Sequence, residues 1–360
     1  MKKLVLGLMS GTSADGLTIS AIVPKPFEIV YFKNYPYDKA FQQKLLSAFS
    51  FKAPALSELH YEIGRRYAKT VLKFLKDFKL SPAQIEAIGM HGQTIYHGPH
   101  DKEPNTLQLG EPSFLAQALQ VPVVSDFRAM DIALGGQGAP LMPFFDSYLW
   151  GHSKTPKILL NVGGISNISI VGNRIKTVGF DCGPGNTLMD LACQKHFQKP
   201  FDKNGNFAAK GTPDKQLVAK LLRQAYFTKR PPKSLDKNDF GQAYLRRYFS
   251  LTNKYDLLAT LTYFTAAAIA QATKQFVPVK AQKELVVSGG GCYNQTLLFW
   301  LRQLLPHIKI TTSLTYRIDP QAKESAAFAL FAWLNLQHKI NHCAHATGAK
   351  KNTILGKVTR

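Results

Sequence analysis

The sequence predicts an α/β protein built of two lobes. Apolar runs typical of strands alternate with amphipathic runs typical of helices, which is the order found in α/β proteins. The chain has 360 residues, and a single hydrophobic core stops growing at roughly 250–300 residues. A strand, a glycine-rich turn and a second strand occur near the N-terminus and again at Ile158–Val171. We therefore expect two similarly built lobes, residues 1–150 and 151–360, with an interlobe cleft.

In the first lobe, short aliphatic and β-branched runs that end in turn formers predict four strands. They are Leu4–Met9, Leu17–Val23, Ile85–Met90 and Val121–Ser125. Residues 55–79 place apolar side chains three and four positions apart, which indicates one buried face of a long helix. A shorter helix is expected from Pro112, and His91–Thr94 is expected to form a loop. A helix over Pro140–Trp150 closes the predicted lobe.

The second lobe is predicted to repeat this alternation of strands and helices. Its strands are Ile158–Val162, Ile168–Val171, Val178–Phe180 and Leu285–Val287. After the third strand we expect a helix capped by Asn186, because asparagine accepts hydrogen bonds from the free N–H groups of a first turn. Long amphipathic helices are expected over about 213–227, 256–277, 293–304 and 320–338.

Basic residues greatly outnumber acidic ones. The 45 Lys and Arg against 23 Asp and Glu give a formal charge of +22, which raises the question of a polyanionic partner. The basic residues are spread in small clusters such as Arg65–Arg66 and Arg246–Arg247. Nucleic-acid binders more typically carry a dense basic stripe or a recognisable zinc-finger or RRM motif. A solvated basic surface is the favoured interpretation, and nucleic acid is not expected as a partner.

The composition favours a cytoplasmic protein without a membrane span. Four widely separated cysteines indicate reduced thiols instead of a disulfide framework or a zinc site. They are Cys182, Cys193, Cys292 and Cys343. The apolar run after Met1 is shorter than a signal peptide requires, and polar residues interrupt the most apolar helix candidate, Leu257–Val277. His338, His342 and His345 fit no standard metal-ligand spacing and are expected, with Cys343, on a surface tail.

Three glycine-rich turns follow apolar strands, at Gly11–Gly16, Gly163–Asn167 and Gly289–Gly291. Exposed backbone N–H groups in such turns form anion sites, so phosphate is a natural ligand. Any one of them alone is better explained as an ordinary tight hairpin. Three of them in two similar lobes favour a nucleotide site, although none matches the Walker A or Rossmann pattern.

Two acidic residues adjoin these turns. Asp181 ends a predicted strand before Gly183 and Gly185, where its carboxylate would serve as a general base. Acceptance of turn N–H groups explains the same position equally well. Asp15 lies in the first turn, where it would help to hold Mg²⁺ through water, or would simply be a turn residue.

The segment after the predicted strand Val121–Ser125 contains Arg128 between Asp126 and Asp131. Arginine pairs with a carboxylate or phosphate through two parallel hydrogen bonds. The alternative is an internal ion pair with one of the flanking aspartates. Glu324 begins the last long helix, where an acidic residue also complements the helix dipole.

Together, these motifs resemble those of one known family, the anhydro-N-acetylmuramic acid kinases, in the superfamily of actin, Hsp70 and sugar kinases. The resemblance covers nearly the whole chain. It rests on Gly7–Gly16, His91–Thr94, Asp126–Arg128 with Gly135–Pro140, Asn161–Asn167, Phe180–Asn186, Ser288–Gly291, Lys323–Glu324 and the C-terminal Thr347–Lys350 and Ile354–Lys357.

The resemblance implies a two-lobed actin-like ATPase (ribonuclease H-like) fold. It also implies a reaction with ATP and Mg²⁺ in which water opens the 1,6-anhydro ring of the sugar while O6 takes the γ-phosphate. Asp181 is then the catalytic base. The implied ATP-binding residues are Gly11, Thr12, Ser13, Ala14, Asp15, Gly16, Leu17, Thr18, Gly163, Gly164, Gly289, Gly290 and Gly291. The implied sugar-binding residues are Thr94, Arg128, Gly185, Asn186 and Glu324.

The sequence departs from the family at three places. Ala14 stands where Met is usual, Glu111 where Asp is common and Ser325 where Ala is usual. Two alternatives stay open: a kinase of another sugar or amino sugar in the same fold, and an actin- or Hsp70-like nucleotide switch. The oligomeric state is open as well, although family members are often homodimers.

Overall fold

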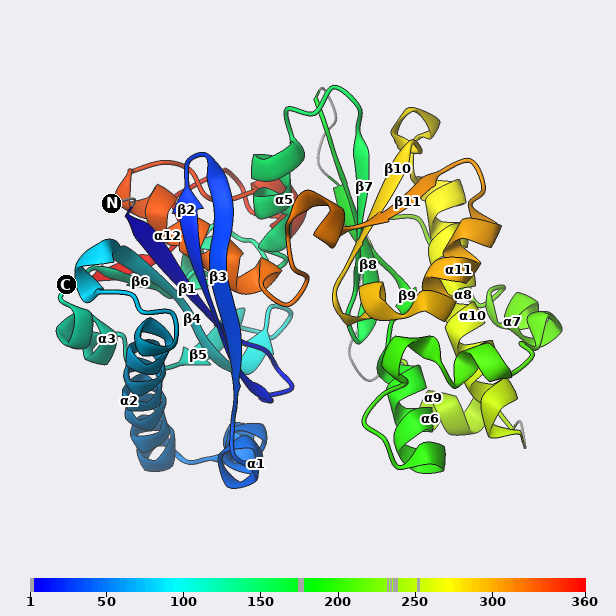
Figure 1. Cartoon of the computed structure of the whole chain (residues 1–360), viewed down its shortest axis with the longest axis horizontal. Coiled ribbons are helices and arrows are strands. Elements are labelled where there is room, and N and C mark those ends of the chain that lie inside the picture. Colours follow the sequence, from blue (N-terminus) through cyan, green and yellow to red (C-terminus); the bar gives the residue numbers. More distant parts are fainter. Residues whose placement is uncertain (1–2, 174–177, 232, 234, 236–238, 251–252) are drawn as a thin grey trace. The chain divides into compact units, whose positions relative to one another are not determined.

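The computed structural model describes residues 3–173, 178–231, 233, 235, 239–250 and 253–360 (Figure 1). The chain forms two compact units, Met1–Phe145 with Gln321–Arg360 and Asp146–Pro320. Two lobes were predicted, but the boundary needs a correction. Residues 321–360 were assigned to the second lobe, whereas they pack within the first unit, where Figure 1 draws them in orange and red.

The first unit is built on a seven-stranded sheet in the order β12-β6-β4-β1-β2-β3, with β5 paired to β4. β1, β4 and β6 run parallel, and β2 and β3 extend β1 as an antiparallel meander. The strands are β1 Leu4–Ser10, β2 Gly16–Pro24, β3 Phe27–Pro36, β4 Ile85–Gly98, β5 Asn105–Leu109, β6 Val123–Ser125 and β12 Lys357–Thr359. β4 continues through His91–Thr94, so the loop expected there was wrong.

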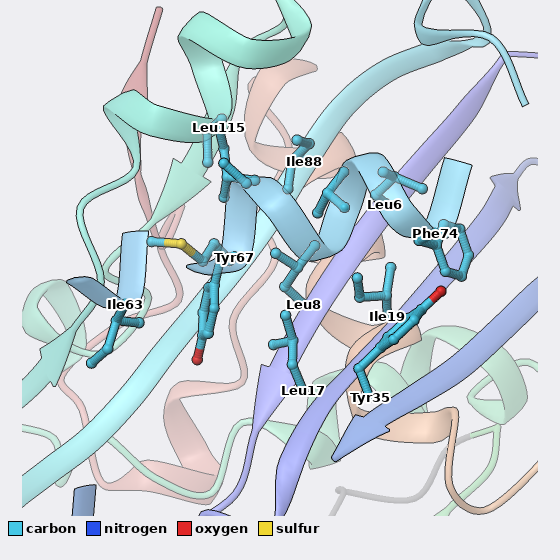
Figure 2. Close-up of a cluster of buried hydrophobic side chains, with 14 of the residues drawn as sticks. Leu6, Leu8, Leu17, Ile19, Tyr35, Ile63, Tyr67, Phe74, Ile88 and Leu115 are labelled. Carbon is cyan, nitrogen blue, oxygen red and sulfur yellow. The ribbon is translucent and has the colours of Figure 1, made fainter. Parts of the chain in front are cut away.

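Helices cover this sheet. They are α1 Lys39–Ser47, α2 Ala53–Asp77, α3 Ser113–Leu119, α4 Ala129–Ala133, α12 Lys323–Leu336 and α13 Ala344–Thr347, with 3₁₀ turns η1 Ala48–Ser50 and η2 Pro82–Gln84. The chain passes into the second unit within α5, Met142–Trp150. The spacing of three and four in the sequence correctly predicted α2. Its Ile63, Tyr67 and Phe74 pack with Leu8 and Ile19 of the sheet (Figure 2).

α12 lies directly against the backbone of the sheet. Gly7 of β1 and Gly89 of β4 are opposite each other in the parallel ladder. A methyl group on Gly7 would overlap the carbonyl oxygen of Ser325, and one on Gly89 would overlap that of Phe328. The two glycines therefore let the helix approach the sheet more closely than any other residue would allow.

The chain after α12 is bound to the same unit by side-chain amides. Asn335 Nδ2 donates to the carbonyl oxygens of Leu355 at 2.9 Å and Gly356 at 3.0 Å, and Asn341 Nδ2 donates to that of Leu355 at 3.0 Å. β12 then pairs with β6. These bonds and the packing of α12 explain why residues 321–360 belong to the first unit.

The second unit has a five-stranded sheet in the order β11-β10-β7-β8-β9. Its strands are β7 Lys157–Val162, β8 Ile165–Val171, β9 Val178–Pro184, β10 Glu284–Ser288 and β11 Lys309–Thr312. Its helices are α6 Thr187–Phe197, α7 Lys215–Leu221, α8 Ala225–Thr228, α9 Gln242–Tyr248, α10 Lys254–Phe276 and α11 Gln295–Leu304, with 3₁₀ turns η3 Lys203–Gly205, η4 Ala208–Lys210, η5 Val279–Ala281, η6 Gly290–Tyr293 and η7 Ser313–Tyr316.

The four predicted strands of this unit are confirmed, and one predicted helix needs correction. The helix expected over 213–227 is two helices, because Gln224 has an extended backbone with ψ of 144° between α7 and α8. α10 is buried along most of its length and packs against α6, α7, α11 and β9. Within the described residues, no helix has the length and apolar character needed to cross a membrane.

Gly7→Ala is expected to lower the free energy of unfolding by roughly 1–3 kcal/mol, because the added methyl group must push α12 away from the sheet. Urea unfolding followed by circular dichroism measures this change. Gly11→Ala is the matched control, since its methyl group would meet only Ser13 Oγ, at an ordinary 3.8 Å. Equal stability of Gly7→Ala and the wild type would contradict the close packing.

Candidate active site

The turn between β1 and β2 forms the first part of the candidate site. The Ala14 N–H donates to the carbonyl oxygen of Gly11 at 3.0 Å, and Ala14 adopts a φ of 49°. The side chains of Thr12, Ser13 and Asp15 are exposed, whereas Ala14 is buried in the core of the first unit. The departure at Ala14 therefore concerns packing beneath the turn, and the exposed face of the turn keeps the residues of the motif.

Gln93 connects this turn to β4. Its Nε2 donates to the carbonyl oxygen of Gly11 at 3.1 Å, and its Oε1 accepts from Ser10 Oγ at 2.6 Å. Thr94 follows, with its Oγ1 accepting from Gln108 Nε2 at 3.3 Å. Because β1 and β4 are parallel, the predicted phosphate turn and the predicted sugar residue Thr94 lie at one edge of the sheet. Gln93 lies inside the His91–Thr94 motif, but the sequence alone assigns it no role.

Arg128 follows β6 and lies at the same edge. Its Nε and Nη2 donate to His91 Nε2 at 3.1 and 2.9 Å, and its Nη1 donates to the carbonyl oxygen of Gly138 at 2.6 Å. Burial lowers the pKa of Arg128 to about 10, so the guanidinium stays charged at neutral pH. The aspartates considered as internal partners bind elsewhere: Asp126 pairs with Lys357 at 2.6 Å, and Asp131 binds His342.

The tail that carries His342 was expected at the surface, but the structure shows His342 buried in a pair with Asp131. His342 is buried, and its Nε2 lies 2.5 Å from Asp131 Oδ1, which also accepts from Thr347 Oγ1 at 2.5 Å. Burial alone would raise the pKa of Asp131, but the bonds from His342 and Thr347 outweigh it and hold the pKa below its ordinary value. His338 and His345 are exposed, as expected. The part of the chain that the structure describes contains no group of three or more His, Cys, Asp or Glu side chains arranged for a metal ion.

Glu324 stands in the first turn of α12. Burial raises its pKa, whereas the charges of Lys323 and Arg128 lower it, so Glu324 and Arg128 lie within electrostatic reach of each other. The next residue explains one departure from the family, because the Oγ atoms of Ser325 and Ser20 form a buried hydrogen bond of 2.6 Å. The departure at Glu111 is also structural: its Oε1 accepts from the Ser113 N–H at 2.9 Å at the start of α3.

In the second unit, a row of polar residues crosses four strands. Ser288 of β10 is opposite Asn161 of β7, Asn161 is opposite Asn167 of β8, and Asn167 is opposite Asp181 of β9. Directly opposed residues share one face of a sheet. β7, β9 and β10 run in the same direction, so the glycine-rich segments after each of them lie at the same edge.

The surroundings of Asp181 are compatible with both interpretations of its position, a carboxylate that accepts turn N–H groups and a general base. Its Oδ2 accepts from the Leu235 N–H at 2.9 Å, as a turn-binding carboxylate would. Burial raises the pKa of Asp181 to about 6, although the Leu235 N–H and the charge of Lys233 act in the opposite direction. A carboxylate with a pKa this close to neutrality is suited to take up a proton during a reaction. Tyr226 holds the strand here, donating from its hydroxyl to the Asp181 carbonyl oxygen at 2.9 Å.

The glycine turns of this unit interlock. The Gly164 carbonyl oxygen accepts from the Gly185 N–H at 2.9 Å, and the Gly163 carbonyl oxygen accepts from the Asn186 N–H at 2.7 Å. Gly164 and Gly290 are exposed, so the turns also reach the surface. Asn186 precedes α6 as predicted, but its side chain makes no capping bond and donates instead to the Val162 carbonyl oxygen at 3.1 Å.

Gly289 and Gly291 are needed for close packing against β7. Gly289 has a φ of 76°, and a methyl group there would lie 2.6 Å from the Val162 carbonyl oxygen, while one on Gly291 would overlap the Val162 side chain. Together, the predicted residues of this unit (Asp181, Gly163, Gly164, Gly185, Asn186 and Gly289–Gly291) gather at one edge of its sheet.

A family model described as anhydro-N-acetylmuramic acid kinase matches residues 3–360. The chain belongs to this family. It is 33% identical to the anhydro-N-acetylmuramic acid kinase of Caldanaerobacter subterraneus, with 99% of this chain and 97% of that protein aligned. The proteins of the same name from Bacillus cereus and Sulfurimonas denitrificans are each 35% identical, over 99% of this chain and 96% and 100% of their own lengths.

A solved structure shares the fold at low sequence identity. The activator of the 2-hydroxyisocaproyl-CoA dehydratase from Clostridium difficile, with bound ADPNP, has a TM-score of 0.50 and 12% identity, over 93% of this chain and 96% of that one. This likeness supports the two-lobed α/β fold that the anhydro-N-acetylmuramic acid kinase motifs implied.

Asp181→Asn is expected to lower kcat by roughly 10²–10⁴-fold while the fold is kept, because the amide oxygen still accepts from Leu235 but cannot take up a proton. If Asp181 is the predicted base, kcat/KM of the wild type should fall as the pH drops through about 6, because the carboxylate becomes protonated. Steady-state rates between pH 5 and 8 measure both effects.

Cys182→Ser is the neighbouring control for this experiment. Cys182 is buried, and burial raises the pKa of its thiol, so it holds no thiolate for chemistry. We expect Cys182→Ser to keep the wild-type rate and pH profile. A fully active Asp181→Asn would contradict the predicted role of Asp181 as base. A folded but inactive Cys182→Ser would contradict the prediction that the Cys182 thiol takes no part in the chemistry.

Proposed function

We propose that this protein phosphorylates 1,6-anhydro-N-acetylmuramic acid with ATP while opening its anhydro ring, giving N-acetylmuramic acid 6-phosphate and ADP in peptidoglycan recycling. The match of residues 3–360 to the kinase family carries this proposal. The geometry of the two sheet edges supports it, because the pKa of Asp181 is raised to about 6, Arg128 is partly buried, and glycine-rich segments follow β1, β7 and β10.

In the proposed reaction, Asp181 takes a proton from water as the water oxygen bonds to the anomeric carbon. The bond from that carbon to the bridging O6 breaks, and O6 bonds to the γ-phosphorus as ADP leaves. The proton remains on Asp181 until it passes to solvent. The raised pKa supports this role, because a carboxylate with a pKa of about 6 is deprotonated at pH 7 yet more basic than an ordinary aspartate.

The turn Gly11–Thr18 is proposed to bind the β- and γ-phosphates of ATP, and Gly163–Gly164 and Gly289–Gly291 are proposed ATP-binding residues as well. Asp15 suits Mg²⁺, since it is exposed in the phosphate turn and Mg²⁺ keeps most of its water while using one or two carboxylates. The ion would neutralise charge on the transferred phosphoryl group. The exposed hydroxyls of Thr12 and Ser13 supply further donors at the same turn.

The sugar is proposed to contact Thr94, Arg128, Gly185, Asn186 and Glu324. Arg128 is the proposed partner of the lactyl carboxylate, because Asp126 and Asp131, the aspartates beside it in sequence, pair with Lys357 and His342 instead. We further propose that the enzyme works in the bacterial cytoplasm on these small molecules. We also propose that it is a homodimer, which sedimentation of the purified protein tests.

ADP release should require the anhydro sugar. With Mg-ATP we expect turnover with 1,6-anhydro-N-acetylmuramic acid, and none with N-acetylmuramic acid or without sugar, because only the anhydro form offers O6 through ring opening. In H₂¹⁸O the product should carry one labelled oxygen at C1. Turnover without the bridge would favour the kinase of another sugar, and ATP binding without turnover would favour the nucleotide switch.

Arg128→Ala is expected to raise KM for the sugar by roughly 10- to 100-fold, with little change in KM for ATP, since a charged hydrogen bond is worth about 1.5–3 kcal/mol. Initial rates at varied sugar and varied ATP separate the two constants. Arg317→Ala, at an exposed arginine of the second unit, is the control for loss of positive charge alone. Equal rises in both KM values would contradict carboxylate pairing.

A further inference from the structure

We propose that His91 is a positioning residue for substrate recognition: as a fixed neutral acceptor it orients Arg128 so that one edge of the guanidinium stays free for the sugar carboxylate. The inference rests on the proposed function and deepens it. Three sets of contacts around Arg128 and His91 support it.

The first set is the hydrogen bonding of Arg128 itself. His91 Nε2 accepts from Nε at 3.1 Å and from Nη2 at 2.9 Å, while the Gly138 carbonyl oxygen accepts from Nη1 at 2.6 Å. Each terminal nitrogen of a guanidinium carries two N–H groups. One N–H on Nη1 and one on Nη2 are therefore not used by these acceptors, so the guanidinium keeps two donors for a ligand such as a carboxylate.

The second set determines the tautomer of His91. Its Nδ1 lies 2.9 Å from the carbonyl oxygen of Gly92, which can only accept, so Nδ1 carries the proton and Nε2 is the acceptor. Burial and the charge of Arg128 lower the pKa of His91 to about 3. The ring is also held by packing, with its centroid 4.7 Å from that of Phe328 on α12. His91 is thus a rigid acceptor that stays neutral across physiological pH.

The third set of contacts fixes the Gly138 carbonyl, which is the other acceptor of Arg128. The Gly138 N–H donates to Asp131 Oδ2 at 2.5 Å, and the carboxylate of Asp131 is bound in turn by His342 and Thr347. The Gln137 N–H donates to the carbonyl oxygen of Thr347 at 2.9 Å. The segment that carries the Gly138 carbonyl is therefore held by hydrogen bonds of its own. Both acceptors of Arg128 have fixed positions.

In this proposal Arg128 binds the carboxylate, and His91 only orients Arg128. Loss of the His91 acceptor leaves the Arg128 charge in place but removes two of the contacts that set its orientation. The cost should then appear in the binding of a ligand with a carboxylate. ATP binding and a ligand without the carboxylate should be unaffected.

The test compares His91→Leu, which removes the acceptor, with His91→Gln, whose side-chain oxygen reaches nearly the same place. We expect His91→Leu to raise KM for 1,6-anhydro-N-acetylmuramic acid roughly 10- to 100-fold. KM for ATP should stay within about twofold, and His91→Gln should restore most of the loss. The same sugar without its lactyl group, 1,6-anhydro-N-acetylglucosamine, is the matched ligand, and its KM should be the same in all three proteins.

A double variant checks that His91 acts through Arg128. In an Arg128→Ala background, His91→Leu should cause no further rise in KM for the carboxylated sugar, because the group it orients is gone. Additive losses would overturn the inference. Equal losses for both sugars, or a matching rise in KM for ATP, would assign His91 a purely structural role and overturn it too.

A measurement on the unaltered protein remains decisive if His91→Leu does not fold. The ¹⁵N shifts of the His91 ring should show a protonated Nδ1 and a bare Nε2 with no titration between pH 5 and 8. A ring that titrates near pH 6.5 would overturn the inference. If the wild type releases no ADP with the anhydro sugar, the proposed function itself is wrong. If the wild type is active and His91→Leu keeps its sugar KM, only the role of His91 is wrong.

Discussion

The close approach of α12 to β1 and β4 is the packing contact on which much of the first unit depends. Gly7 and Gly89 lie opposite each other, and a methyl group on either would overlap a backbone carbonyl of the helix. The same contact builds part of the candidate site. It puts Glu324 at the start of the helix within electrostatic reach of Arg128, and it puts Phe328 against the ring of His91. Fold and site therefore share one interface, and a residue that loosened it would disturb both.

Burial acts in opposite directions on the groups that matter for chemistry. It raises the pKa of Asp181 to about 6, so a carboxylate becomes a usable base near neutrality. It lowers the pKa of His91 to about 3, so a histidine that would otherwise titrate at cellular pH remains a neutral acceptor. Arg128 keeps its charge despite burial. At neutral pH, Asp181 is therefore deprotonated and Arg128 is charged, while His91 is neutral because burial and the charge of Arg128 disfavour its protonated form.

The C-terminal segment contributes to the site from a distance in sequence. His342 and Thr347 bind Asp131, which holds the Gly138 N–H, and the Gly138 carbonyl binds Arg128. This series of bonds gives a physical reason for residues 321–360 to return to the first unit. It also explains why the histidines near the C-terminus do not behave alike: His342 is an internal partner, whereas His338 and His345 remain at the surface.

The sequence by itself determined the class of fold, most of the strands, the helix α2 and the glycine turns. These follow from local patterns, since spacing of apolar residues and turn chemistry record which face is buried and where the chain reverses. The family motifs likewise named Asp181 and Arg128. Only the tertiary structure decided that α12 belongs with β1, that β4 runs through His91–Thr94, and that His342 reaches Asp131 across 211 positions of chain. A local pattern shows that a residue is buried, but its partner is chosen by packing between segments far apart in sequence.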